Sequence, residues 1–152
     1  MRITEILDKR CVRLPMKAQD RDGAIRELVG ALHEAGKLDD ERAVLEAILA
    51  RERTRTTGIG RGLAVPHGKS PGSPSLVMAV GKPPKPINFQ STDGKPCDLV
   101  VLLASPLDRT GPHIQALAGI SRLWLNDEFR QAVGAAESAD ALYKAITKHQ
   151  SD

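Results

Sequence analysis

The sequence has 152 residues, of which 41% are hydrophobic and 27% are charged, and its formal net charge is +3. This composition is typical of globular chains and excludes global disorder, and the apolar runs are far shorter than the roughly 20 residues of a membrane-spanning helix. Because no signal segment is recognisable either, we expect a single cytoplasmic domain over residues 1–152. Cys11 and Cys97 fit neither a disulfide framework nor a zinc site, so we expect free thiols.

The first part of the chain is expected to contain a short helix over 3–9 and a short strand over 11–14. An amphipathic helix follows over 20–35, because its apolar residues recur on one stripe. Asp20 can cap the start of this helix and Gly36 can end it.

A second helix is expected to begin after Asp39 or Asp40 and to end near Arg51–Arg53. The residues that follow, T-R-T-T-G-I-G-R-G at 54–62, are rich in hydroxyl groups and glycines. We expect this segment to form a loop, because glycine allows backbone conformations that are closed to other residues.

The remaining elements predict the fold class. Three short apolar runs bounded by turn residues predict strands, at Leu63–Val65, Leu76–Val80 and Leu99–Leu103. Helices are expected to start near Gly111–Pro112 and to cover roughly 127–135 and 138–148. We therefore expect an α/β fold of three layers, α/β/α, with a central mixed sheet, because some strand connections are too short for parallel crossovers.

Positive charge is concentrated in one window. Residues 51–69 hold five basic residues and one acidic residue, a net charge of +4, so the rest of the chain sums to −1. A small basic patch suits a phosphate or an acidic partner. Nucleic-acid binding normally uses a wider basic face and stacking aromatics, and aromatics are 3% of this chain, so we expect no nucleic-acid partner.

Two of the four histidines have settings that suit chemistry. His67 follows a strand and a proline and precedes Gly68, so a rigid turn presents an imidazole that could act as a nucleophile or acid–base group. His113 lies in the first turn of a predicted helix, where free N–H groups attract anions and the dipole favours neutral imidazole. For both, a structural histidine is the alternative. His33 and His149 are expected to have no functional role.

Arg51 and Arg53 close the second predicted helix, either as caps of its dipole or as arginines that reach over the 58–68 loop to bind a phosphate. The G-K-S at 68–70 has the wrong spacing for a phosphate-binding P-loop, and G-I-G-R-G at 58–62 is not the dinucleotide fingerprint. No spacing typical of a metal site is present. Nucleotide and metal sites are therefore not expected.

Several longer motifs point to one family. The stretch L-E-A-I-L-A-R-E-R, followed by T-T-G-I-G-R-G-L-A-V-P-H-G-K, resembles the EIIA domains of the fructose/mannitol/nitrogen-regulatory class of the bacterial phosphoenolpyruvate-dependent phosphotransferase system. Its second signature is matched by D-G-K-P-C-D-L-V-V-L-L-A-S-P and H-I-Q-A-L-A-G-I-S-R-L, and its last helix by S-A-D-A-L-Y-K-A-I. The resemblance covers almost the whole chain and implies the mannitol-EIIA-like fold, with the G-K after His67 nearest to the nitrogen-regulatory branch.

The resemblance also implies roles for single residues. His67 stands at the position of the phosphorylated histidine, His113 at the second active-site histidine, and Arg51 at the arginine that stabilises the phosphoryl group. Support for the phosphate is expected from the loop glycines and a lysine, namely Gly58, Gly60, Gly62 and Lys69. The chain departs from the commonest pattern at Pro112 and Ile114, on either side of His113.

The activity implied by the resemblance is that of a phosphohistidine carrier, a transferase that needs no cofactor or metal. It would take a phosphoryl group from the histidine-containing phosphocarrier protein. It would pass the group to an EIIB domain, or use it as a nitrogen or carbon regulatory signal to a kinase or transporter. No EIIB or EIIC domain follows in the sequence, so we expect a free-standing carrier or regulator without membrane insertion. A phosphorylation-independent regulatory binding protein on the same fold is the alternative.

Overall fold

One mixed β-sheet organises the structure, a computed structural model that describes residues 2–151. The strands run in the spatial order β1-β5-β6-β3-β2, and β4 continues beside β6. β5 and β6 are antiparallel, as are β2 and β3, whereas β1 pairs with β5 and both β3 and β4 pair with β6 in parallel. The strands are β1 (Leu7–Arg13), β2 (Gly58–Gly60), β3 (Leu63–Ala64), β4 (His67–Lys69), β5 (Val77–Gly81) and β6 (Leu99–Ser105).

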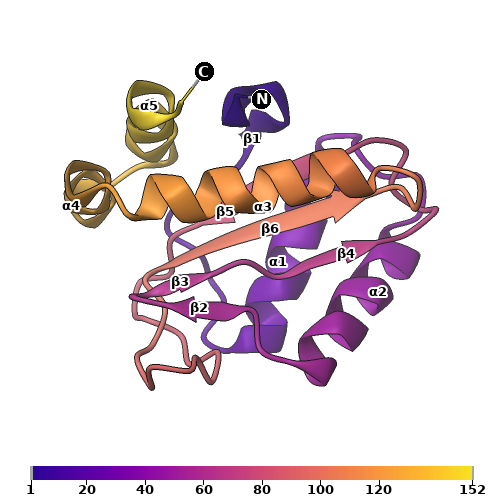
Figure 1. The fold of residues 1–152 in the computed structure, drawn as a ribbon, viewed down its shortest axis with the longest axis horizontal. Coiled ribbons are helices and arrows are strands. Elements are labelled where there is room, and N and C mark those ends of the chain that lie inside the picture. Colours follow the sequence, from indigo (N-terminus) through magenta and orange to yellow (C-terminus); the bar gives the residue numbers. More distant parts are fainter. Residues whose placement is uncertain (1, 152) are drawn as a thin grey trace.

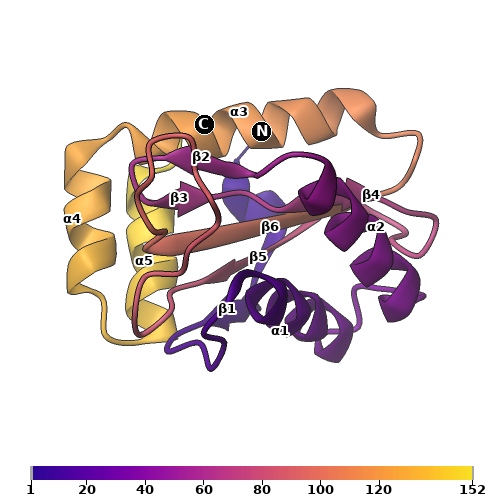
Figure 2. The ribbon, with the colours of Figure 1, turned by 90° about the horizontal axis from the view of Figure 1, so that it is seen from below.

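Helices cover both faces of this sheet, which confirms the predicted three-layer α/β arrangement. In Figures 1 and 2, α1 and α2 lie on one face and α3 crosses the other, with α4 and α5 beyond its C-terminal end. No helix within residues 2–151 is long and apolar enough to cross a membrane. The helices are a 3₁₀ turn η1 (Ile3–Glu5) and α1 (Arg21–Glu34), α2 (Glu41–Thr54), α3 (Thr110–Trp124), α4 (Asp127–Ala135) and α5 (Ala139–His149).

The helix boundaries follow the capping signals of the sequence. The Asp20 carboxylate accepts from the Gly23 N–H at the start of α1, and Asp40 does the same for Ala43 at the start of α2. Gly36 has a φ of +73° just after α1, the left-handed conformation that commonly ends a helix. The predicted helices over 20–35 and 127–135 are confirmed.

The core lies between β5 and β6 and the helices around them. Every residue of both strands is buried, which explains why they are continuous apolar runs rather than alternating ones. The two cysteines are buried, unpaired thiols, and burial raises the pKa of each.

Two segments differ from the prediction. The expected helix over 3–9 is only a single 3₁₀ turn, Ile3–Glu5, and its last residues belong to β1, which begins at Leu7 and also contains most of the strand expected over 11–14. The pairing of this edge strand with β5 has a register shift, which interrupts the alternation of buried and exposed residues along it. The expected loop over 54–62 contains β2, which pairs with β3 as a short hairpin. His67 follows β3 and Pro66, as expected, and is also the first residue of β4.

Candidate functional site

A pocket of about 360 Å³ opens beside His67 on the side of the sheet crossed by α3. Its wall combines the end of α2, the segment leading into β2, and one side of α3, so residues far apart in sequence meet there. The lining residues are Arg51, Arg55, Thr56, Thr57, Gly58, Ile59, Val65, His67, Thr92, Leu117 and Ser121. The structure thus brings Arg51 and His67 to one cavity.

The His67 ring is held in one tautomer by the backbone. Its Nδ1 lies 2.8 Å from the carbonyl oxygen of Val65. A carbonyl can only accept, so Nδ1 must carry the proton and Nε2 keeps its lone pair. Burial lowers the pKa of His67 and the nearby Arg51 charge lowers it further, against the opposing effects of the Val65 bond and Glu52. His67 is therefore a neutral imidazole with a free Nε2 near neutral pH.

His113 is packed against His67 and is almost fully buried. The two ring centres are 5.3 Å apart and the rings meet edge to face at 62°. Burial, reinforced by His67 and Lys69, lowers the pKa of His113 to about 4, so this ring is also neutral. Its Nδ1 lies 2.7 Å from the hydroxyl oxygen of Ser105, at the C-terminal end of β6.

Ser105 determines which nitrogen of His113 carries the proton. The Ser105 side chain is fully buried, and within residues 2–151 the structure gives its hydroxyl no acceptor other than His113 Nδ1. A buried hydroxyl left without an acceptor costs about 1–3 kcal/mol. The Ser105 O–H therefore donates to Nδ1, which leaves the proton of His113 on Nε2.

A chain of hydrogen bonds connects His67 to a buried carboxylate on α2. Glu52 is 2% exposed and accepts from both the N–H and the hydroxyl of Thr57. The Thr57 carbonyl accepts from the Val65 N–H at 3.0 Å, and the Val65 carbonyl holds His67. Glu52 thus fixes the segment that orients His67, and bonds aligned in such a chain polarise one another.

The other predicted site residues occupy different positions. Arg51 donates from Nη1 to the carbonyl of Arg55, so it caps α2 while it lines the pocket. Lys69 donates to the Thr110 hydroxyl at 2.6 Å and influences the pocket through the charge it places near His113.

Of the three loop glycines, only Gly58 lines the His67 pocket, and its N–H is bonded to the Thr56 hydroxyl. Gly60 is the last residue of β2, and Gly62 lies in the turn of the β2–β3 hairpin and lines a different pocket.

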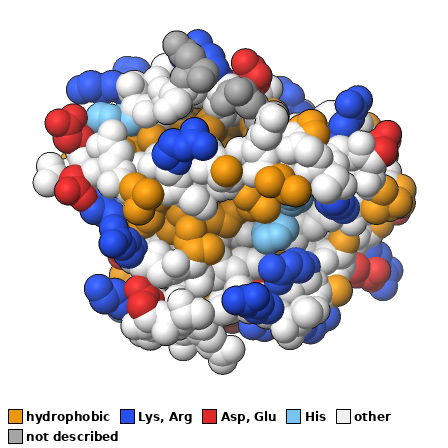
Figure 3. All heavy atoms as spheres, viewed as in Figure 1, with side chains coloured by type: hydrophobic (Ala, Val, Ile, Leu, Met, Phe, Trp, Pro, Cys, Tyr) orange, Lys and Arg blue, Asp and Glu red, His pale blue; other side chains and the backbone are white. Residues whose placement is uncertain are grey.

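Exposed apolar side chains lie at the pocket wall and beside His113. Ile59, which lines the pocket, is 50% exposed, and Ile114, next to His113 on α3, is 59% exposed. Figure 3 shows hydrophobic side chains gathered along α3 beside a histidine, with basic side chains next to it. A surface of this kind can be covered by a partner that excludes water from the pocket.

Sequence reasoning missed Ser105 and Glu52. Ser105 is the polar residue that ends a buried apolar strand, a position often used by functional groups, and this was the available signal. Glu52 gave no signal, because its partner Thr57 lies beyond the end of the helix. His33 is exposed on α1. His149 packs against Phe129, and neither of these two residues lines the His67 pocket. Among the described residues, no group of three or more potential ligands could hold a metal ion.

Comparison with known proteins gives a consistent result for almost the whole chain. Residues 5–149 match the family model described as "Phosphoenolpyruvate-dependent sugar phosphotransferase system, EIIA 2". The crystal structure of nitrogen regulatory protein IIA-Ntr from Neisseria meningitidis has a TM-score of 0.85 at 28% identity, over 95% of this chain and 98% of that one.

Two curated relatives have different names. The fructose-specific EIIABC component of Bacillus subtilis is 37% identical over 98% of this chain, which spans only 24% of that relative. The nitrogen regulatory protein of Bradyrhizobium diazoefficiens is 34% identical over 96% of this chain and 95% of its own length.

Proposed function

The chain belongs to the EIIA 2 family of the phosphoenolpyruvate-dependent sugar phosphotransferase system, and on this premise we propose that His67 Nε2 carries a phosphoryl group between two partner proteins. The observation that carries the proposal is the state of His67: a neutral ring, with Nδ1–H bonded to the Val65 carbonyl and Nε2 unprotonated, in a pocket that contains Arg51. A neutral imidazole nitrogen with a free lone pair is a nucleophile near neutral pH.

The transfer needs no acid or base at His67. The Nε2 lone pair forms the N–P bond as the N–P bond of the donor's phosphohistidine breaks, and the donor's imidazole leaves with the electron pair. No proton has to move on His67, because Nδ1–H stays on the Val65 carbonyl throughout. Catalysis is then mainly alignment and stabilisation of charge on the phosphoryl oxygens.

Two neighbours supply that stabilisation. The Arg51 guanidinium has N–H groups beyond the one bonded to Arg55, and arginine binds phosphate oxygens in a fork. His113, neutral with its proton on Nε2, donates a further hydrogen bond to the phosphoryl group. The exposed apolar side chains around the pocket exclude water while a partner is docked, which protects the labile N–P bond.

The proposed donor is the histidine-containing phosphocarrier protein, and the proposed recipient is an EIIB domain or a regulated protein. The name of the Bacillus subtilis relative combines A, B and C components, which supports an EIIB recipient. The name of the Bradyrhizobium relative supports a regulatory role. Both outcomes use the same chemistry at His67.

The proposal is tested by incubating the protein with phosphoenolpyruvate, enzyme I and the histidine-containing phosphocarrier protein, and recording its intact mass. Wild type should gain one acid-labile phosphoryl group. His67→Ala should gain none, whereas His33→Ala, which removes an exposed histidine from α1, should behave as wild type. Phosphorylation of His67→Ala, or its absence in wild type with a cognate donor, would contradict the proposal and favour a phosphorylation-independent binding protein.

A further inference from the structure

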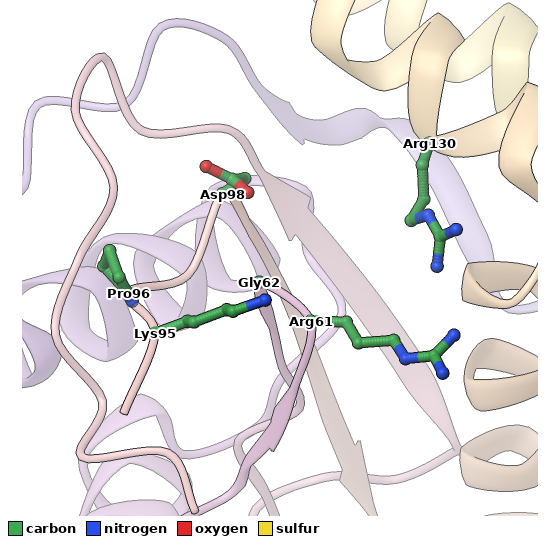
Figure 4. A pocket seen from close by; sticks show the side chains of 6 residues that line it. All are labelled: Arg61, Gly62, Lys95, Pro96, Asp98 and Arg130. Atoms are coloured by element: carbon green, nitrogen blue, oxygen red, sulfur yellow. The ribbon is translucent and has the colours of Figure 1, made fainter. Parts of the chain in front are cut away.

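A second pocket lies at the turn of the β2–β3 hairpin, and none of the residues that line it also lines the His67 pocket. Its volume is about 520 Å³, larger than that of the His67 pocket. It is formed by the hairpin turn, the segment leading into β6, and α4 (Figure 4). The lining residues are Arg61, Gly62, Lys95, Pro96, Asp98 and Arg130.

Three of the four charged groups in this pocket are cations. In Figure 4 the guanidinium groups of Arg61 and Arg130 converge on one side, Lys95 extends toward Gly62, and Asp98 points away from the arginines. Arg130 also forms an ion pair with Asp127, whose side chain is 79% exposed. Asp98 is the only carboxylate among the six lining residues, which carry a charge of +2, and this excess of cations suits an anion. The carboxylates of Asp93 and Asp127 contact these cations from outside the lining.

One carboxylate fixes the backbone of two of these cations. Asp93 accepts from the Arg61 N–H at 2.8 Å and from the Lys95 N–H at 3.1 Å, and these bonds lower the pKa of Asp93. The hairpin turn and the segment before β6 are therefore joined at the edge of the pocket. Asp93 stays ionised at neutral pH, so it holds the two residues together under physiological conditions.

Arg61 has an unusual backbone conformation that is held from its other side as well. Its φ is +57°, in the left-handed region that a non-glycine residue adopts only at some cost. The Trp124 indole N–H donates to the Arg61 carbonyl at 3.0 Å, and Arg130 donates to the Trp124 carbonyl at 3.1 Å. Arg61 and Arg130 are thus positioned through one tryptophan.

The surroundings of the cations indicate what kind of anion fits. Asp98 can accept hydrogen bonds from hydroxyl groups but would repel a bare anion placed against it. A cavity of about 300 Å³ adjoins the pocket, sharing Arg61, Asp98 and Arg130 and adding the rings of Pro83, Pro84 and Pro86. These features suit a ligand with a charged end, hydroxyl groups and an apolar surface.

We propose that this pocket binds a small hydroxylated phosphate monoester, with its phosphate between Arg61, Lys95 and Arg130 and its hydroxyl groups on Asp98. Arginine forks and a lysine ammonium are the side chains that bind phosphate best. The hairpin whose turn forms this pocket also carries Gly58 and Ile59 into the His67 pocket, so a bound ligand contacts an element shared by both sites.

The test is a binding measurement that does not involve phosphoryl transfer. Ribose 5-phosphate, adenosine monophosphate and inorganic phosphate are titrated separately into isotope-labelled protein, and amide chemical shifts are followed at constant ionic strength with sodium chloride as the reference. Ribose 5-phosphate should shift the amides of Arg61, Gly62, Lys95 and Arg130 saturably. Its affinity relative to adenosine monophosphate distinguishes a sugar phosphate from a nucleotide as the source of the monoester.

Three variants assign the binding to the pocket. Lys95→Gln and Arg61→Asn should each weaken ribose 5-phosphate binding by about tenfold, corresponding to about 1.4 kcal/mol; asparagine tolerates the left-handed conformation of residue 61. Asp98→Ala should lower the ratio of affinity for ribose 5-phosphate to that for inorganic phosphate. The matched control is Arg42→Gln, which removes a highly exposed cation from α2.

Each outcome of these titrations either supports the proposed site or overturns it. Saturable shifts at the pocket that are lost in Lys95→Gln but kept in Arg42→Gln support the site. Shifts that sodium chloride reproduces, or that persist equally in Lys95→Gln and Arg61→Asn, overturn it. An unchanged affinity ratio in Asp98→Ala overturns the hydroxylated ligand class. Failure of His67 to accept a phosphoryl group leaves this inference untouched.

Discussion

At the scale of single residues, the two histidines of the proposed site obtain their tautomers by different means. His67 depends on a peptide carbonyl, whereas His113 depends on the hydroxyl of Ser105. The sequence pattern and the family resemblance led to His67, His113 and Arg51; in the structure Arg51 lines the same pocket as His67, and the His113 ring packs against that of His67. Ser105 could not be assigned in the same way, because its role exists only once β6 and α3 are packed together.

Ser105→Ala is expected to release the His113 ring from a single tautomer. The nitrogen-15 shifts of His113 should change from an Nε2–H ring to a mixture, because Nδ1 loses its donor. Phosphoryl acceptance at His67 should slow by roughly tenfold, the scale of one lost hydrogen bond to a charged group. The matched control is Ser73→Ala, which removes another buried hydroxyl, bonded to the Ser75 carbonyl. If the tautomer of His113 is unchanged in Ser105→Ala, Ser105 does not determine which nitrogen carries the proton.

At the scale of elements, the distance between α2 and β4 sets the position of Arg51 relative to His67. The neighbour that needs a residue without a side chain at position 68 is Ile48 of α2. A Cβ at Gly68 would lie 3.0 Å from Ile48 Cγ1 and 3.1 Å from the Ile48 backbone nitrogen. The backbone cannot yield as a flexible side chain would.

Gly68→Ala should therefore push α2 away from β4. We expect a loss of about 1–3 kcal/mol in the free energy of unfolding and slower phosphoryl acceptance, measured by denaturant unfolding and by intact mass over time. Gly30→Ala is the matched control: nothing lies near that position in α1, so it should stabilise by about 0.5–1 kcal/mol. If Gly68→Ala accepts the phosphoryl group at the wild-type rate, the distance between α2 and β4 does not control the transfer.

Elements with strong local signals were predictable and those without were not. α1 and α2 carry aspartate caps and apolar stripes, and β5 and β6 are continuous apolar runs, so sequence alone located them. β2 has three residues, two of them glycines, and exists because β3 pairs with it. Such a strand has no periodicity to recognise.

At the scale of the whole molecule, buried neutral groups make stability depend on pH. The pKa of His113 is about 4 in the folded state against an ordinary value of 6.5. Between these values the unfolded chain binds a proton that the folded chain does not, so stability decreases as pH falls from about 7 to about 4. The pKa values of Asp93 and Asp140 are also lowered in the folded state, so protonation of these carboxylates extends the loss of stability to more acidic pH.

Urea unfolding at a series of pH values measures this dependence. His113 should contribute about 3 kcal/mol of the loss between pH 7 and pH 4, at about 1.4 kcal/mol per pKa unit. In His113→Asn the curve of stability against pH should be flatter by that amount, whatever the variant's stability at pH 7. His33→Asn, at an exposed histidine, should keep the wild-type slope. Parallel curves for wild type and His113→Asn would rule out a buried neutral His113.

The bond from His67 to the Val65 carbonyl also affects how this site can change by mutation. Every amino acid has a peptide carbonyl, so no substitution at position 65 removes the hydrogen-bond acceptor. The orientation of the His67 ring is therefore insensitive to side-chain mutations at position 65. The proton on His113 depends on one hydroxyl that a single base change can delete. Lineages that abandon transfer and keep only binding should therefore lose the serine–histidine pair early, while the turn that presents His67 survives.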